Sequence, residues 1–175
     1  QSTGPVTLTP IVPSAWPAAC KSDANACSIG LRIDYCRSSV LFTGDASSQE
    51  EALFDTRGPV TLLQVAHHGA ETSTSAAFVA NVKPKYAVIS SAKPEEGTND
   101  GYCHPRAVTV RTLTEAMGGA GSRTVKAFDG TEKCKKGDPK PEHWQEVPAS
   151  DRLWTTARDG GVTLTTAGDG VFTKE

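Results

Sequence analysis

The sequence predicts an α/β fold in which helices flank a mixed β-sheet. Strand-like and helical patterns alternate from residue 60 to residue 128, which is the order that builds an α/β layer. Two strand-like runs, residues 60–68 and 86–91, are apolar and rich in β-branched side chains, as expected for strands buried on both faces. Because 175 residues can bury a core of their own, we expect a single domain over residues 1–175.

The N-terminal part is predicted to contain three strands and a helix. Residues 6–12 form the first strand, and residues 28–35 and 38–45 form a hairpin. Residues 47–58 form the helix, because two serines are each followed three positions later by a glutamate and a glycine ends the pattern. These residues are Ser47 with Glu50, Ser48 with Glu51, and Gly58.

The remaining elements follow from helix-ending and turn residues. Helices are expected over residues 73–84, where Pro84 ends the pattern, and over residues 104–119, with Pro105 in the first turn and Gly118 as the C-terminal cap. After these come a strand at 123–128, a probable insertion loop at 129–150, and a closing hairpin at 152–170 that turns at Asp159 and Gly160.

Composition excludes a broad cationic surface. Eighteen Lys and Arg against 20 Asp and Glu give a formal charge of −2, so an anionic substrate must be held locally by a metal or a few lysines. The sequence contains no run of 18 apolar residues, so no membrane segment is predicted. Its N-terminus lacks the charged and apolar regions of a signal peptide. A chain that starts at Gln1 is expected to be a processed product or an expression fragment.

Five cysteines point to an oxidising compartment. None has the C-x-x-C spacing of a zinc or redox motif, whereas Cys20 and Cys27 can close a small surface disulfide. We therefore expect a secreted, periplasmic or extracellular protein in which one cysteine is left over or pairs outside the chain. Buried free thiols are the alternative.

Candidate metal ligands stand at the ends of three predicted elements. Asp45 closes an apolar strand, His67 and His68 close the next, and His104 starts a helix after a polar loop. Loops at strand ends suit hydrolytic metal sites, because the sheet fixes ligand geometry and the loop leaves room for substrate. Each has a purely structural alternative: Asp45 as a turn residue, one histidine of the pair as a hydrogen-bonded strand end, and His104 as a helix cap.

Five segments together resemble the metallo-β-lactamase fold, and within it the ComEC-type competence-protein hydrolase domains and their secreted relatives. The segments are "DANACSIGLRIDY", "VLFTGDA", "VAHHGAETSTSAAFVANVKPKYAVISSA", "NDGYCHPRAV" and "LWTTARDGGVTLTT". The resemblance implies that the chain is the C-terminal half of an αββα sandwich.

The resemblance also implies roles for individual residues. Asp45 would bridge two divalent metal ions, zinc or manganese, and His68 would bind the second ion. His67, also a metal candidate, would support the strand end or orient the ligands, and His104 would lie near the substrate phosphate as a proton donor or phosphate contact. Three further residues match polar positions around the substrate pocket: Ser91, Asn99 and Tyr102. Asn25 and Ser28 match positions interpreted as structural.

Departures from the family pattern shape the functional prediction. The motif His-x-His-x-Asp-His, which supplies most ligands to both metals, is absent. We therefore expect the N-terminal half that carries it to be a separate chain or a cleaved precursor segment that shares the two metals. Ala70 stands where a serine is usual, which removes a hydroxyl contact, and Cys103 replaces a glycine, which can tie the substrate loop by a disulfide, for instance to Cys134.

The predicted activity is hydrolysis of a phosphodiester by metal-activated water, with DNA, RNA or a phosphorylcholine-like ester as substrate. Without the missing half the chain is expected to be inactive. Two alternatives stay open. One is a metal-free binding or structural module that retains the fold, and the other is a lactone or β-lactam hydrolase.

Overall fold

A mixed sheet of six strands forms the centre of the molecule, in the order β1-β2-β3-β4-β5-β8. The computed structural model describes residues 4–94, 96–137 and 140–175. The N-terminal strands pair antiparallel and the remaining ones parallel, so the predicted α/β class with a mixed sheet is confirmed. That the sheet is half of a larger sandwich, and that residues 1–175 form one domain, stay predictions.

The antiparallel part is the predicted hairpin with one more strand at its edge. β2 (Gly30–Tyr35) pairs with β3 (Ser38–Phe42), and β1 (Val6–Ile11) pairs with β2 on the other side. The register places Leu8 opposite Ile33, and Ile33 opposite Val40. Residues opposite one another share a face of the sheet, so these strands carry an apolar row on one face.

The parallel part consists of β3, β4 (Leu62–Gln64), β5 (Tyr86–Ile89) and β8 (Leu153–Thr155). The prediction of a closing hairpin at 152–170 is wrong, because β8 joins β5 in parallel and α5 (Thr156–Asp159) follows it directly. Asp159 stabilises the start of α5 instead of forming a hairpin turn. Its carboxylate accepts a hydrogen bond from the Thr155 amide at 2.9 Å and forms an ion pair with Arg123 at 2.7 Å.

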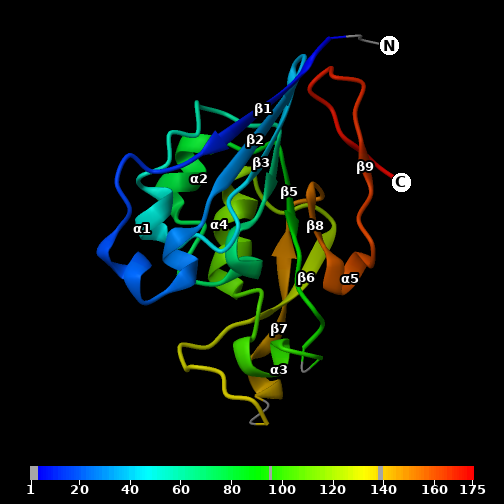
Figure 1. Ribbon diagram of the computed structural model, residues 1–175. Helices are drawn as coiled ribbons and strands as arrows, with labels where there is room; N and C mark the ends of the chain where they lie inside the picture. Colours follow the sequence, from blue (N-terminus) through cyan, green and yellow to red (C-terminus); the bar gives the residue numbers. More distant parts are fainter. Residues whose placement is uncertain (1–3, 95, 138–139) are drawn as a thin grey trace.

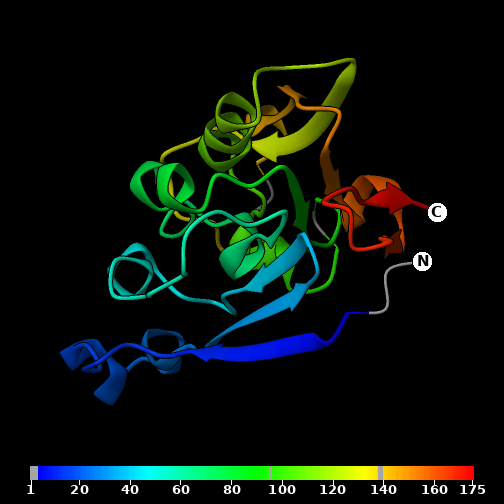
Figure 2. The ribbon, with the colours of Figure 1, turned by 90° about the horizontal axis from the view of Figure 1, so that it is seen from above.

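Helices cover one face of the sheet, and the C-terminal segment covers part of the other (Figures 1 and 2). The first face packs on α2 (Ala76–Val82) and α4 (Ala107–Ala116), whose apolar side chains join those of β4 and β5 in the main core. On the second face, Phe172 packs against Tyr86 and Trp154 in a smaller cluster beside β9 (Leu164–Thr165) and β10 (Thr173–Lys174).

The second face is open over the antiparallel strands. Val6, Leu8 and Phe42 are 60%, 62% and 39% exposed, and Leu31, Ile33 and Val40 are only half-buried. These six side chains are called the open face below. Its apolar character continues from the small cluster, because Val40 lies opposite Leu62.

Two predicted boundaries differ from the structure. The helix expected at residues 47–58 is only α1 (Ser48–Glu51). Ser47 and Glu50 form the predicted capping box at its start, whereas Glu51 bonds to the loop at Thr74. The insertion loop expected at 129–150 is wrong in its last part, where β7 (Trp144–Ala149) pairs antiparallel with β6 (Arg123–Phe128). Val147 and Ala149 of β7 are buried on alternate positions, as a half-buried strand requires.

Two short elements complete the part near the pocket: the turn η3 (Ala66–Gly69) after β4, and the helix α3 (Asn99–Tyr102) before α4. Other 3-10 turns are η1 (Ala18–Lys21), η2 (Ala24–Cys27) and η4 (Pro141–His143). Within the described part of the chain, no helix has the length and apolarity needed to cross a bilayer.

Candidate metal and phosphate site

A pocket of about 610 Å³ lies at the carboxyl ends of the parallel strands. Asp45 follows β3, the histidine pair follows β4, and Thr156 follows β8. Ligand sites in open α/β sheets commonly lie outside the carboxyl ends of the strands. All seven residues selected from the sequence line this pocket, and so do five that were not assigned to it: Asn25, Ser90, Ala92, Thr98 and Thr156.

The histidine pair occupies a turn and not the strand end that the sequence predicted. β4 ends at Gln64, and His67 and His68 both have positive φ, 49° and 56°. Non-glycine residues rarely adopt this conformation, and such outliers cluster at functional sites. The turn is held on both sides, because the His67 amide donates to the Gly44 carbonyl at 3.0 Å and the Arg106 amide donates to the Gly69 carbonyl at 2.9 Å.

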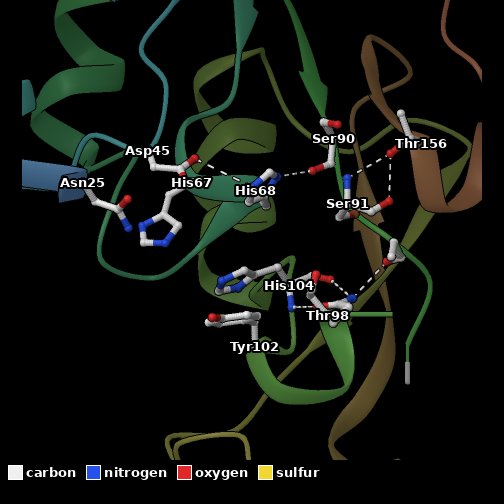
Figure 3. A pocket seen from close by; sticks show the side chains of 12 residues that line it. Asn25, Asp45, His67, His68, Ser90, Ser91, Thr98, Tyr102, His104 and Thr156 are labelled. Atoms are coloured by element: carbon white, nitrogen blue, oxygen red, sulfur yellow. Dashed lines mark hydrogen bonds and ion pairs between the residues drawn. The ribbon is translucent and has the colours of Figure 1, made fainter. Parts of the chain in front are cut away.

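His68 is oriented by a hydrogen bond on one nitrogen and faces Asp45 with the other (Figure 3). Its Nδ1 lies 2.7 Å from the Ser90 carbonyl oxygen, which can only accept, so the hydrogen-bond network assigns the proton to Nδ1. In the neutral ring, Nε2 is then the lone-pair nitrogen, and it lies 3.7 Å from Asp45 Oδ1. Histidines that bind metals are commonly held in this way, with the second ring nitrogen bonded to a carbonyl.

His104 and His67 form the inner wall of the pocket. Their rings meet edge to face with centroids 5.7 Å apart, and neither buried Nδ1 has a hydrogen-bond partner among the described residues. Burial, followed by the charges of His67, Arg106 and His68, lowers the pKa of His104 from 6.5 to about 4. The ring is therefore neutral at pH 7 and can accept a hydrogen bond or a proton.

Asn99 holds the backbone of His104 from both sides. Its Oδ1 accepts from the His104 amide at 2.7 Å, and its Nδ2 donates to the His104 carbonyl at 2.7 Å and to the Ala92 carbonyl at 2.9 Å. These bonds use both amide hydrogens and the amide oxygen. Asn99 thus positions the His104 loop, and the substrate contact expected of it stays a prediction.

Ser91 and Tyr102 offer different groups to the pocket. The Ser91 hydroxyl is buried without a partner in the described structure, while Thr156 holds its backbone with bonds of 2.9 and 2.7 Å. Tyr102 is 60% exposed, and its ring stacks near His104 with centroids 6.0 Å apart. Both side chains remain available to a ligand.

Two buried glutamates hold the loops that carry Asp45 and the histidine pair, and Glu51 links the two loops. Glu50 accepts from the amide and hydroxyl of Ser47, just after Asp45, at 2.8 and 2.6 Å. Glu51 accepts from the amides of Thr74 and Ser75, after the histidine turn, at 2.5 and 3.0 Å. The sequence signal for Glu51 was misleading, because the same Ser-x-x-Glu spacing that marks a capping box also fits this long-range role.

Two disulfides and a limited ligand set complete the site. Cys103 pairs with Cys134 beside the pocket, and Cys20 pairs with Cys27 in the N-terminal turns, so the expected disulfides are confirmed. The fifth cysteine, Cys36, is exposed and lies outside both. Across residues 4–94, 96–137 and 140–175, no three His, Cys, Asp or Glu side chains are grouped so as to hold a metal ion.

Comparison with known proteins gives a partial relationship. No protein-family model matches the chain. The chain is similar to Recombination protein 2 of Haemophilus influenzae, with 43% identity over 70 residues, which amount to 39% of this chain and 9% of that protein. The chain thus matches only a small part of the relative's length, and the match does not establish a family.

Proposed function

We propose that the chain is the C-terminal half of a metal-dependent phosphodiester hydrolase of the metallo-β-lactamase fold. The observation that carries this proposal is the orientation of His68, whose Nδ1 is bonded to the Ser90 carbonyl and whose Nε2 faces Asp45 Oδ1 at 3.7 Å. A histidine with a purely structural role in this turn would not require a carboxylate opposite its lone-pair nitrogen.

The residues present fit part of a metal site. Asp45 Oδ1 and His68 Nε2 lie 3.7 Å apart, so these two side chains would hold one divalent ion without a large rearrangement. In such sites a pair of divalent ions activates water and neutralises charge on the transferred phosphoryl group. Zinc is the ion that best suits imidazole with carboxylate, and manganese is the alternative.

The other pocket residues would act on the substrate. Neutral His104 can bond to a phosphate oxygen or take up a proton, and the Ser91 hydroxyl can donate to the same group. His67 packs against His104 and keeps its ring in place. Two protein ligands are too few for a dinuclear centre, so the remaining ligands would come from an N-terminal half, carried on a separate chain or a cleaved precursor segment.

The open face supports such a partner. It presents a contiguous apolar surface across β1, β2 and β3, on the side of the sheet opposite the helices. A second sheet packed on this surface would bury it, as in a two-sheet sandwich. The two disulfides fit an extracellular or periplasmic setting.

Native mass spectrometry of the protein from its natural source, combined with metal quantitation, tests the proposal. The expected species contains this chain, a second polypeptide and two metal ions. An 18.4 kDa species without a partner or metal would refute it.

The ligand assignment is tested by hydrolysis of bis(p-nitrophenyl) phosphate by the two-part protein. Asp45→Asn and His68→Ala should lower the rate by at least a hundredfold. The control is His143→Ala, since His143 packs on Phe128 outside the pocket. Full activity of both site variants would overturn the assignment.

A metal-free binding module is the second candidate. It is favoured by the absence of a three-ligand group among the described residues. Under this alternative the native species contains no stoichiometric metal, and Asp45→Asn leaves ligand binding unchanged.

A further inference from the structure

The turn that carries His67 and His68 needs support from the rest of the fold. Both residues have positive φ, 49° and 56°. Non-glycine residues keep such a conformation only where the surrounding contacts determine it. On the N-terminal side the turn is held by the hydrogen bond from the His67 amide to the Gly44 carbonyl. On the C-terminal side it is held by the start of α4.

The start of α4 contacts three consecutive residues that follow the histidine pair. The Arg106 amide, at the N-cap, donates to the Gly69 carbonyl at 2.9 Å. The buried Thr109 hydroxyl donates to the Ala70 carbonyl at 3.0 Å. Arg106 Nε lies 2.9 Å from Oε2 of Glu71, in an ion pair whose geometry is not that of a hydrogen bond. Residues 69, 70 and 71 are therefore each fixed by a contact to the same helix start.

The Arg106 side chain is itself fixed behind the histidine turn. Its buried guanidinium lies over the Phe128 ring, 4.8 Å from the ring centroid, and its Nη1 donates to the Gly130 carbonyl at 3.3 Å. The Phe128 amide in turn donates to the Pro105 carbonyl at 2.9 Å. A planar guanidinium held on a ring and a carbonyl has little freedom to move. Neither Arg106 nor Thr109 is among the residues that line the pocket, so both act on it from behind.

We propose that Arg106 and Thr109 are positioning residues, which hold the histidine turn in its left-handed conformation and so keep Nε2 of His68 directed at Asp45. These two side chains are called the α4 clamp below. The inference deepens the proposed function, because it names what orients a ligand before any ion binds. The orientation of His68 can nevertheless be measured in the intact, metal-free chain, so the two proposals can fail separately.

Long-range ¹H–¹⁵N NMR correlation of the imidazole nitrogens, in EDTA at a pH where histidines are normally neutral, tests the clamp. In the parent, Nδ1 of His68 should carry the proton, because it lies 2.7 Å from the Ser90 carbonyl oxygen. In Arg106→Met, Thr109→Val the two ring signals should move toward each other, because Nδ1 loses its fixed acceptor and both tautomers become populated. Exchange of the His67 amide should accelerate about tenfold or more, as expected when an ion pair and a hydrogen bond are lost.

The matched control, Arg111→Met, Thr114→Val, changes the same residue types on the same helix. Arg111 pairs with Asp129 at 2.6 Å, and the Thr114 hydroxyl accepts from the Ser150 amide at 3.3 Å. The control therefore removes an ion pair and a hydroxyl bond that do not involve the histidine turn. Its His68 signals should match those of the parent. Circular dichroism confirms that each variant is folded.

A conservative variant separates the charge and the hydroxyl from packing. Arg106→Lys, Thr109→Ser keeps both groups and should stay closer to the parent in its His68 signals than Arg106→Met, Thr109→Val does. If the latter does not fold, Thr109→Val alone, which nearly keeps the side-chain shape, should shift the signals in the same direction.

Several results would overturn the inference. They are a proton on Nε2 of His68 in the parent, unchanged signals in the folded clamp variants, equal shifts in the clamp and control pairs, or no recovery in Arg106→Lys, Thr109→Ser. A His68 tautomer that depends on the clamp supports the inference even if the two-part protein proves unable to bind metal or to hydrolyse phosphodiesters.

Discussion

Acidification is expected to destabilise the native chain through His104. The ring is buried against His67, and burial is the largest cause of its lowered pKa, about 4 instead of 6.5. As the pH falls through 6.5, the unfolded chain takes up a proton on His104 while the native chain does not. The stability present above pH 6.5 is therefore lost progressively down to about pH 4, and no further loss follows below it.

The size of the effect follows from the interval between the two pKa values. Each pH unit corresponds to about 1.4 kcal/mol, so the fall from 6.5 to about 4 corresponds to about 3 kcal/mol. Screening by solvent is small at this site and hardly lowers the value, because His104 is only 8% exposed. Other groups titrate in the same range, so the contribution of His104 must be measured as a difference.

The variant His104→Gln isolates the contribution. Asn99 holds the backbone of residue 104, so the loop keeps its two anchoring bonds when the side chain changes. Urea unfolding followed by tryptophan fluorescence gives the free energy of unfolding of both proteins at pH 7 and pH 4. The advantage of the parent over the variant should shrink by about 3 kcal/mol between these pH values. An unchanged difference, or an NMR titration that places the ring pKa near 6.5, would refute the reasoning.

Four further substitutions test how the loops and edges are held. The measurement is urea unfolding, at pH 7 except where another pH is named. Glu51→Ala should lower the free energy of unfolding by about 3 kcal/mol, because two buried amides lose their acceptor. Burial raises the pKa of Glu51 despite its bonds to Ser75 and Thr74, so the parent should gain stability relative to Glu51→Gln as the pH falls from 7 toward 4.5; an unchanged gap would contradict this. Arg123→Met should cost about 3 kcal/mol by leaving Asp159 buried without its partner. Phe172→Ala should cost about 3 kcal/mol by exposing the second cluster, and losses below about 0.5 kcal/mol would show that the C-terminal segment contributes little.

Short-range sequence patterns correctly predicted the hairpin of β2 and β3 and the helices α2 and α4. The hairpin of β2 and β3 follows from alternation and a two-residue turn, and α2 and α4 follow from helical spacing with a proline at the end or the start. Convergence of Asp45, the histidine pair and Ser91 could also be predicted, because each follows a strand that joins the same parallel sheet. Strand ends of one sheet meet at one edge whatever the loops between them contain.

The errors arose where distant contacts decide the structure. β7 contains Pro148 and two acidic or amide side chains, which weaken its strand signal, but pairing with β6 and burial of Val147 outweigh them. β8 was taken for one arm of a hairpin because glycines follow it, although its partner is β5. No local pattern reports which strand lies opposite, since burial across the sheet depends on the whole fold.

The backbone of the histidine pair bears on the choice between a metal site and a bare scaffold. A strand that simply ended at His68 would direct adjacent side chains to opposite faces of the sheet. The left-handed turn instead brings both rings into the pocket, His67 against His104 and His68 between Ser90 and Asp45. Two non-glycine residues in this conformation cost about 1–3 kcal/mol each, and His68 remains 52% exposed, so its ring gains little from burial in return. Under the proposed function, a ligand shared between this exposed imidazole and the Asp45 carboxylate would offset the strain.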